Sequence, residues 1–279
     1  MKTACLMHND LDGFSSGYSL WKALKGTDEL MFIEVQYGQE PPYEALREFK
    51  PDRVYIVDFS YKAPVLKDFL NEFPETMVID HHKSSLSELE AAFEDRVYKT
   101  YVHDVNLSGC VMTWQHLFPE EEVPEILLYV QDRDLWKFEL ENSKEINAFI
   151  ASLPKDFEEW DSFYTPEAYD AGRAIIRVQE KAIERRLKDV RMVEIAGHTV
   201  PCVNASENIS ELGGAMCEAY PDAPFSVSYC DRGDGKRSYS LRSRNGFDVS
   251  EVAKTRGGGG HQASSGFTLE SPSVFLGAE

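Results

Sequence analysis

Apolar and polar residues follow two alternating patterns along the first third of the chain. Short apolar runs typical of buried strands are separated by stretches in which apolar residues recur at helical spacing. The strand-like runs are TACLMH, MFIEVQY, RVYIVDF and TMVID, and the helical stretches are FSSGYSLWKALKG, PPYEALREF, PVLKDFLNEF and SLSELEAAFED. This alternation predicts a parallel sheet covered by helices, so we expect an α/β fold for the N-terminal region.

A long helix is predicted after Thr165-Pro166, because threonine can cap a helix whose first turn accepts proline. Helical spacing then continues to about Asp189. Such a helix either joins two domains or belongs wholly to the first domain. We place the domain boundaries on the interpretation that it joins two domains. The expected parts are a catalytic domain at 1–165, a linker helix at 166–189 and a smaller α/β domain at 190–279.

The pattern of the last part mixes strands and helices. VRMVEIAGHTVPCV reads as a hairpin with its turn at Gly197-His198. The segments that follow are the helix ISELGGAMCEAY, the strands FSVSYC and SYSLRS, the helix VSEVAK and the glycine run Gly257 to Gly260 with His261. These elements complete a second, smaller α/β domain.

Length and composition favour a cytoplasmic protein. The chain has 279 residues, enough for two domains that each bury a core. Its apolar runs are far shorter than the roughly 18 residues that a membrane span needs, and MKTACLMHND has no apolar signal core. Five scattered cysteines, never spaced as C-x-x-C, indicate neither a disulfide framework nor a zinc ribbon. We therefore expect no membrane association.

The formal net charge of −19 opposes binding to long duplex DNA, whose affinity comes mostly from phosphates neutralised by lysine and arginine. One stretch departs from this acidity. Residues 231–261 contain seven basic and four acidic side chains, a local net charge of +3. This stretch is either a solvated basic surface or the place where an anionic substrate binds.

Acids and histidines stand where the predicted strands end. Functional groups gather at the carboxyl ends of parallel strands because the loops there line a common crevice. These residues, with one acid that follows the apolar helix EILLYVQ, are His8, Asp10, Asp12, Asp58, Asp80, His81, His82 and Asp132. A set of carboxylates and imidazoles suits Mn²⁺ or Mg²⁺. Asp134 competes with Asp132 for the last place, and we favour Asp132 because it follows the apolar helix directly.

The order of these motifs resembles that of the DHH phosphoesterase family. The matching features are His8-x-Asp10-x-Asp12-Gly13, VDF, Asp80-His81-His82, QDRD and the glycine run before His261. The segment SLRSRNGFDVSEVAKTRGGGGHQASSGF is similar to the DHH-associated C-terminal domain. The resemblance covers nearly the whole chain. It implies two divalent metal ions, usually Mn²⁺ with Mg²⁺ or Co²⁺ as alternatives, in an α/β domain over which a smaller domain closes.

The resemblance also implies roles for individual residues. His8 and Asp10 would bind one metal, Asp12 and His81 the other, with Asp58 bridging them and Asp132 completing the set. The catalytic residues would then be His82, Asp58 and Asp80. Of these, His82 would point at the scissile phosphate, while Asp80 would orient a histidine or its loop.

Substrate binding is expected in the C-terminal domain. Glycine lets backbone N–H groups approach an anion, a following helix would add its positive end, and arginine can bind phosphate through two hydrogen bonds. The expected residues are Arg242, Ser243, Arg244, Gly258, Gly259, Gly260 and His261. A flexible hinge is the alternative interpretation of the glycines. Among the tryptophans, only Trp136 is singled out for stacking on a base.

We therefore predict a Mn²⁺-dependent phosphodiesterase that hydrolyses very short single-stranded oligonucleotides or dinucleotides to mononucleotides. A phosphatase acting on 3′,5′-bisphosphorylated nucleotides and a non-catalytic nucleotide sensor are the alternatives. Pyrophosphatase activity is disfavoured by the one-residue interval between His8 and Asp10, and RecJ-like activity by the length of the chain. A homodimer and a monomer both remain open.

Overall fold

The computed structural model describes residues 1–270, which form two compact units divided between Ile176 and Arg177. The first unit contains a five-stranded parallel sheet in the order β2-β1-β3-β4-β5. Its strands are β1 (Lys2–His8), β2 (Glu29–Val35), β3 (Arg53–Val57), β4 (Thr76–Asp80) and β5 (Tyr101–His103). The three central strands are the apolar runs of the sequence, buried because helices cover both faces of the sheet.

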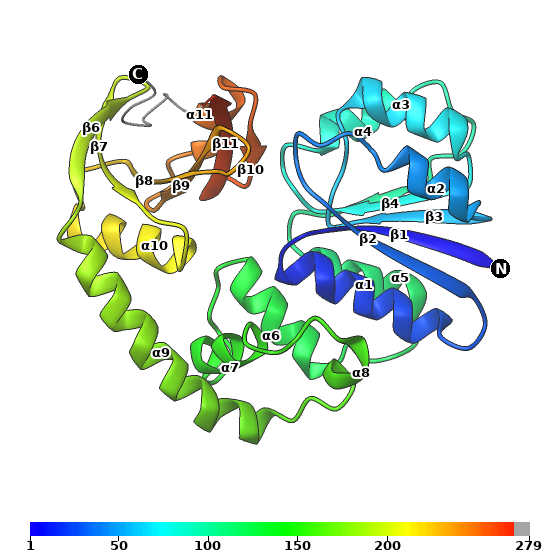
Figure 1. Cartoon of the computed structure of the whole chain (residues 1–279), viewed down its shortest axis with the longest axis horizontal. Coiled ribbons are helices and arrows are strands. Elements are labelled where there is room, and N and C mark those ends of the chain that lie inside the picture. Colours follow the sequence, from blue (N-terminus) through cyan, green and yellow to red (C-terminus); the bar gives the residue numbers. More distant parts are fainter. Residues whose placement is uncertain (271–279) are drawn as a thin grey trace, which may run out of the picture. The chain divides into compact units, whose positions relative to one another are not determined.

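Helices cover the two faces of this sheet in separate groups (Figure 1). On one face lie α2 (Tyr43–Phe49), α3 (Ala63–Glu72) and α4 (Leu86–Ala92). On the other lie α1 (Leu11–Leu24) and α5 (Gly109–Leu117). Helices α6 (Glu125–Asp134) and α8 (Phe157–Trp160) pack against α1, and α7 (Ser143–Ile150) packs against α6. A long helix, α9 (Thr165–Leu187), packs its first turns on this second group through Ala168. The sheet therefore has helices on both faces, with further helices outside α1 and α5.

The second unit contains a mixed six-stranded sheet in the order β10-β11-β9-β8-β7-β6. Only β7 and β8 pair in parallel. The strands are β6 (Arg191–Ile195), β7 (His198–Asn204), β8 (Phe225–Asp231), β9 (Lys236–Ser243), β10 (Gly259–Gly260) and β11 (Ser264–Glu270). The last turns of α9 and helix α10 (Ile209–Ala219) pack on one face, and α11 (Val249–Lys254) packs on the other.

The predicted fold class is confirmed: a parallel-sheet α/β region is followed by a second region with a mixed sheet. The hairpin turn lies one residue earlier than predicted, at Ala196 and Gly197, whose φ angles of 52° and 79° suit a type I′ turn. The expected helix after the glycine run is wrong, since β11 follows it. No helix within residues 1–270 combines the length and apolar character required to cross a membrane.

Candidate metal centre

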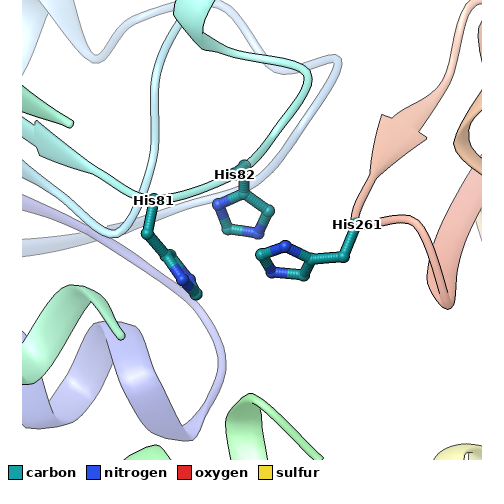
Figure 2. A group of neighbouring side chains, drawn as sticks. All are labelled: His81, His82 and His261. Atoms are coloured by element: carbon teal, nitrogen blue, oxygen red, sulfur yellow. The ribbon is translucent and has the colours of Figure 1, made fainter. Parts of the chain in front are cut away.

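Three adjacent strands bring the predicted metal ligands to one edge of the sheet. His8 ends β1, Asp58 directly follows β3, and Asp80 ends β4. His81 and His82 extend from the loop after β4 (Figure 2). The third side chain drawn there, His261, follows β10 in the second unit. The strand order β1-β3-β4 explains why residues some 70 positions apart meet.

Asp58 occupies the middle of the cluster. Its side chain is 1% exposed, with Oδ2 3.6 Å from His8 Nδ1 and Oδ1 3.1 Å from His81 Nε2. Neither oxygen accepts a hydrogen bond from any residue in the described range 1–270. Its backbone is left-handed, with φ of 53°, a conformation that non-glycine residues adopt chiefly at strained functional sites. A buried carboxylate in this state is suited to binding a cation.

The first ligand group consists of His8, Asp10 and Asp58, whose donor atoms lie within 4.8 Å of one another. His8 Nδ1 is 2.7 Å from Asp10 Oδ2. The other ring nitrogen, Nε2, is 3.0 Å from Gln36 Oε1, which also accepts a hydrogen bond from the Tyr37 N–H. Because that oxygen is an acceptor, His8 Nε2 carries the proton and Nδ1 is the nitrogen that faces the acids.

The second ligand group consists of Asp12, Asp58 and His81. Asp12 Oδ2 lies 3.5 Å from His81 Nε2 and accepts a hydrogen bond from the Gly109 N–H (2.6 Å), while Oδ1 accepts one from the Cys110 N–H (3.0 Å). The N-terminus of α5 therefore holds this carboxylate in place. Asp58 belongs to both groups, which is the arrangement expected of a ligand shared by two ions.

Gly109 is essential to this packing. A Cβ atom at this position would lie 2.6 Å from Asp58 Cβ, 2.9 Å from Asp58 Oδ1 and 3.0 Å from Asp12 Oδ2. Only glycine lets the start of α5 approach both carboxylates so closely. No local sequence pattern marks this residue, because its contacts are with segments far away in the chain.

Asp80 holds His82. Asp80 Oδ1 lies 2.8 Å from His82 Nδ1 and accepts a hydrogen bond from the His82 backbone N–H at 3.1 Å. The hydroxyl of Ser85 and Nε2 of His103 donate to the His82 carbonyl at 2.8 and 3.0 Å. Asp80 thus contacts the ring drawn in Figure 2 directly, while the other hydrogen bonds hold the His82 backbone.

The acid of α6 that lies beside His81 is Asp134 and not Asp132. Asp134 Oδ2 lies 3.5 Å from His81 Nε2 and accepts no hydrogen bond from residues 1–270. The carboxylate of Asp132 instead accepts hydrogen bonds from the Glu139 and Leu140 N–H groups. Both residues lie in the last turn of α6 but face different partners. This geometry favours Asp134, and the ligand role of Asp132 stays a prediction.

The cluster holds several buried acids whose negative charge must be neutralised. Burial raises the pKa of Asp58 well above its usual range, and the charges of Asp12 and Asp10 raise it further. Burial and the charge of Asp12 raise the pKa of Asp134 to about 7. Burial lowers the pKa of His8, but the adjacent Asp10 and Asp58 carboxylates outweigh it and bring the pKa to about 11. Protons or divalent cations must therefore neutralise the acids, and the ligand set suits the cations.

The predicted substrate residues of β9 already have partners within the second unit. Arg242 donates from Nη2 to Ser210 Oγ at 2.8 Å and from Nη1 to the Leu241 carbonyl at 2.9 Å. Ser243 Oγ donates to the Phe247 carbonyl, and Arg244 Nη1 lies 2.7 Å from Glu218 Oε1 on the surface. These contacts hold the side chains in place, and their role in substrate binding stays a prediction.

The glycine run has a structural explanation of its own. The N–H groups of Gly257 and Gly258 donate to the Lys254 and Ala253 carbonyls and so close α11. A Cβ at Gly258 would clash with the Gly266 carbonyl on β11, and Gly259 and Gly260 pair with that strand as β10. His261 exchanges backbone hydrogen bonds with Ser264 in the turn that follows. Close packing alone therefore requires glycine at Gly258.

Curated proteins similar to this chain come from a virus and a bacterium. No family model matches the chain. It is 30% identical to the uncharacterized protein R106 of Acanthamoeba polyphaga mimivirus over 92% of this chain and 65% of that protein. It is 26% identical to oligoribonuclease NrnB of Bacillus subtilis over 94% of this chain and 71% of that protein.

The similarity to oligoribonuclease NrnB supports the resemblance to the DHH phosphoesterase family. The chain spans about two thirds of the length of the curated relatives that it matches. Two solved structures, each 14% identical, share its fold. A pGpG-specific phosphodiesterase, PggH, from Vibrio cholerae has a TM-score of 0.50 with coverage of 97% of this chain and 94% of that one. RecJ from Thermus thermophilus in complex with Mn²⁺ has a TM-score of 0.52, with coverage of 96% and 49%.

Proposed function

We propose that this protein is a metal-dependent phosphodiesterase that hydrolyses very short oligonucleotides to mononucleotides. The observation that carries the proposal is the pair of ligand groups that share Asp58, both of whose buried oxygens lack hydrogen-bond donors among residues 1–270. Shared carboxylates of this kind are typical of two-metal hydrolases. The absence of a thiol from both groups favours Mn²⁺ or Mg²⁺ over softer ions.

In the proposal, His8, Asp10 and Asp58 hold one ion, and Asp12, Asp58 and His81 hold the other, with Asp134 beside His81. Two bound divalent cations supply Lewis acidity toward the phosphate and make a water molecule nucleophilic near neutral pH. The protein's own contribution is to fix the carboxylates. Asp12 is held by two N–H groups of α5, and Asp58 by its left-handed backbone.

His82 is proposed to contact the scissile phosphate. Its ring is fixed by Asp80, and its Nδ1 lies 4.0 Å from Asp58 Oδ1, beside both ligand groups. With Nδ1 directed at Asp80, Nε2 is the ring nitrogen that would donate a hydrogen bond to a phosphate oxygen.

A short substrate fits the charge of the chain. A net charge of −19 repels a long polyanion, whereas residues 231–261 offer a small basic region that contains Arg242 and Arg244. Among the proteins compared, one is named an oligoribonuclease and another a pGpG-specific phosphodiesterase. We propose that Arg242, Ser243, Arg244, Gly258, Gly259, Gly260 and His261 bind a terminal phosphate of such a substrate.

The test is hydrolysis of 5′-phosphorylated RNA of two to about twenty nucleotides with Mn²⁺. We expect the rate to be highest at the shortest lengths, to depend weakly on salt because few phosphates are bound, and to vanish in excess chelator. A flat or rising length profile with steep salt dependence would instead indicate an open nuclease groove. Release of phosphate from a 3′,5′-bisphosphorylated nucleotide without dinucleotide cleavage would indicate a phosphatase. Tight nucleotide binding without product would indicate a sensor.

A further inference from the structure

The loop that follows α6 exposes an aromatic side chain in an unfavourable backbone conformation. Trp136 and Phe138 both have left-handed backbones, with φ angles of 57° and 52°. Bulky residues rarely adopt this region, and such outliers persist where the surroundings enforce them, often at ligand-binding sites. Two left-handed residues within the three positions 136–138 therefore require a structural explanation.

Asp132 enforces this conformation. Its carboxylate accepts hydrogen bonds from the Glu139 N–H (2.9 Å) and the Leu140 N–H (3.3 Å). Its backbone carbonyl accepts from the Lys137 N–H at 2.9 Å. The residue is only 5% exposed, and the hydrogen bonds to its carboxylate are partly buried. Asp132 thus anchors the loop that carries Trp136.

The loop keeps the indole at the surface. Trp136 is 37% exposed, whereas Trp114 and Trp160 are 4% and 2% exposed and Trp21 packs against the core. The ring of Phe138 braces the indole edge-on, with centroids 4.9 Å apart and planes at 79°. A strained segment that holds an aromatic ring outward is the opposite of what core packing requires.

Trp136 also lies close to the metal centre. It follows Asp134 by two residues, and two residues span at most about 7 Å. Asp134 is itself 3.5 Å from His81. An indole can therefore be presented to a base whose phosphate is bound at the ligand groups.

We propose that Trp136 is a stacking platform for a nucleobase next to the scissile phosphate, and that Asp132 is the positioning residue that holds it there. This inference rests on the proposed function and adds a base-binding subsite to it. Stacking of a base on an aromatic side chain tolerates every base, so the subsite selects for a nucleoside and not for a sequence. It gives the exposed indole and the strained loop a single explanation.

The main experiment compares wild type, Trp136→Phe and Trp136→Ala in the full chain with Mn²⁺. The two substrates are a dinucleotide and an analogue that lacks one base. Loss of the platform should lower kcat/KM for the dinucleotide by about tenfold to a hundredfold in Trp136→Ala, and by much less in Trp136→Phe. The abasic analogue should be cleaved equally by all three. An equal loss on both substrates would overturn the proposal, since the loop would then merely support Asp134.

Two further measurements distinguish base stacking on Trp136 from effects on catalysis and on folding. Titration with a nucleoside 5′-monophosphate should quench tryptophan fluorescence in wild type but not in Trp136→Phe, even if wild type cleaves no dinucleotide and the proposed function fails. Equal quenching in both would overturn the platform. Asp132→Ala should show the same base-dependent loss with unchanged Mn²⁺ affinity. An Asp132→Ala protein that cleaves both substrates like wild type would overturn its positioning role.

Discussion

A single methyl group at Gly109 should disable the metal centre. In Gly109→Ala the new Cβ would lie 2.6 Å from Asp58 Cβ, whereas non-bonded carbons prefer about 3.5 to 4.0 Å. One of the two must therefore move by about 1 Å. Asp58 cannot yield easily, because it is buried and its N–H donates to the Ile79 carbonyl at 2.8 Å. The start of α5 carries the donors to Asp12, so its movement would release that carboxylate.

The size of the effect follows from this geometry. Overpacking a buried site by one methyl group lowers the free energy of unfolding by about 1 to 3 kcal/mol. A displacement of about 1 Å at a catalytic group lowers the rate by about a hundredfold. We therefore expect Gly109→Ala to fold with a lower melting temperature, to bind Mn²⁺ at least about tenfold more weakly, and to lose about a hundredfold in kcat/KM. Calorimetric Mn²⁺ titration, thermal melting and dinucleotide hydrolysis measure the three quantities.

Gly17→Ala is the matched control. Its Cβ would lie 2.5 Å from Met7 Sδ and 3.3 Å from Phe157 Cζ, so the strain falls on a flexible thioether away from the ligands. This variant should lose stability but keep its Mn²⁺ affinity. If Gly109→Ala bound Mn²⁺ and turned over like wild type, the inference that α5 holds Asp12 and Asp58 in a ligand geometry would be refuted.

Other substitutions at the centre have distinct expected outcomes. In Asp58→Asn, the asparagine tolerates the left-handed backbone and a buried charge is removed, so the melting temperature measured in chelator should rise. The rate of hydrolysis should fall at least about a thousandfold. Asp134→Asn should weaken Mn²⁺ binding and Asp132→Asn should not; the reverse result in titrations would restore our sequence-based choice. Gln36→Met removes the acceptor of the His8 proton and should weaken Mn²⁺ binding about tenfold to a hundredfold, while Gln36→Glu should retain it. The metal-free site binds protons at Asp134, whose pKa is raised to about 7, and at His8, and the ions must displace them. Mn²⁺ affinity should therefore rise with pH between about 6 and 8, and a flat profile would contradict this proton competition.

The sequence predicted the sheet and most of the cluster for one physical reason. Apolar runs buried on both faces mark the central strands, and the residues after them must meet at the carboxyl edge. That logic places His8, Asp58 and His81 without further information. It fails for α6, where Asp132 and Asp134 lie two positions apart and so point to different sides of the helix. Helical spacing puts Asp134 one turn beyond Val130, but Asp132 is the more deeply buried of the two acids, so neither spacing nor burial alone selects the residue beside His81.

Contacts between distant segments decided the features that could not be predicted. Gly109 is required by Asp58 and Asp12, and Gly258 by Gly266 on a neighbouring strand. From the sequence, the glycine run was expected to let its backbone N–H groups approach an anion. In the structure, glycine is required at Gly258 because the backbone of β11 passes very close to it. Likewise, no local pattern marks the left-handed backbones of Trp136 and Phe138, which arise from hydrogen bonds to Asp132.

Every member of the two ligand groups comes from the unit that ends at Ile176. In the proposed enzyme, the ions are therefore structural components of that unit as well as catalytic ones. By mass action, an ion at a hundred times its dissociation constant adds roughly 2.7 kcal/mol to the stability of the unit that binds it. The second unit has its own cores and gains nothing directly. Metal supply would thus set the lifetime of this larger unit, and scarcity of the ion would expose it to proteolysis before the second unit.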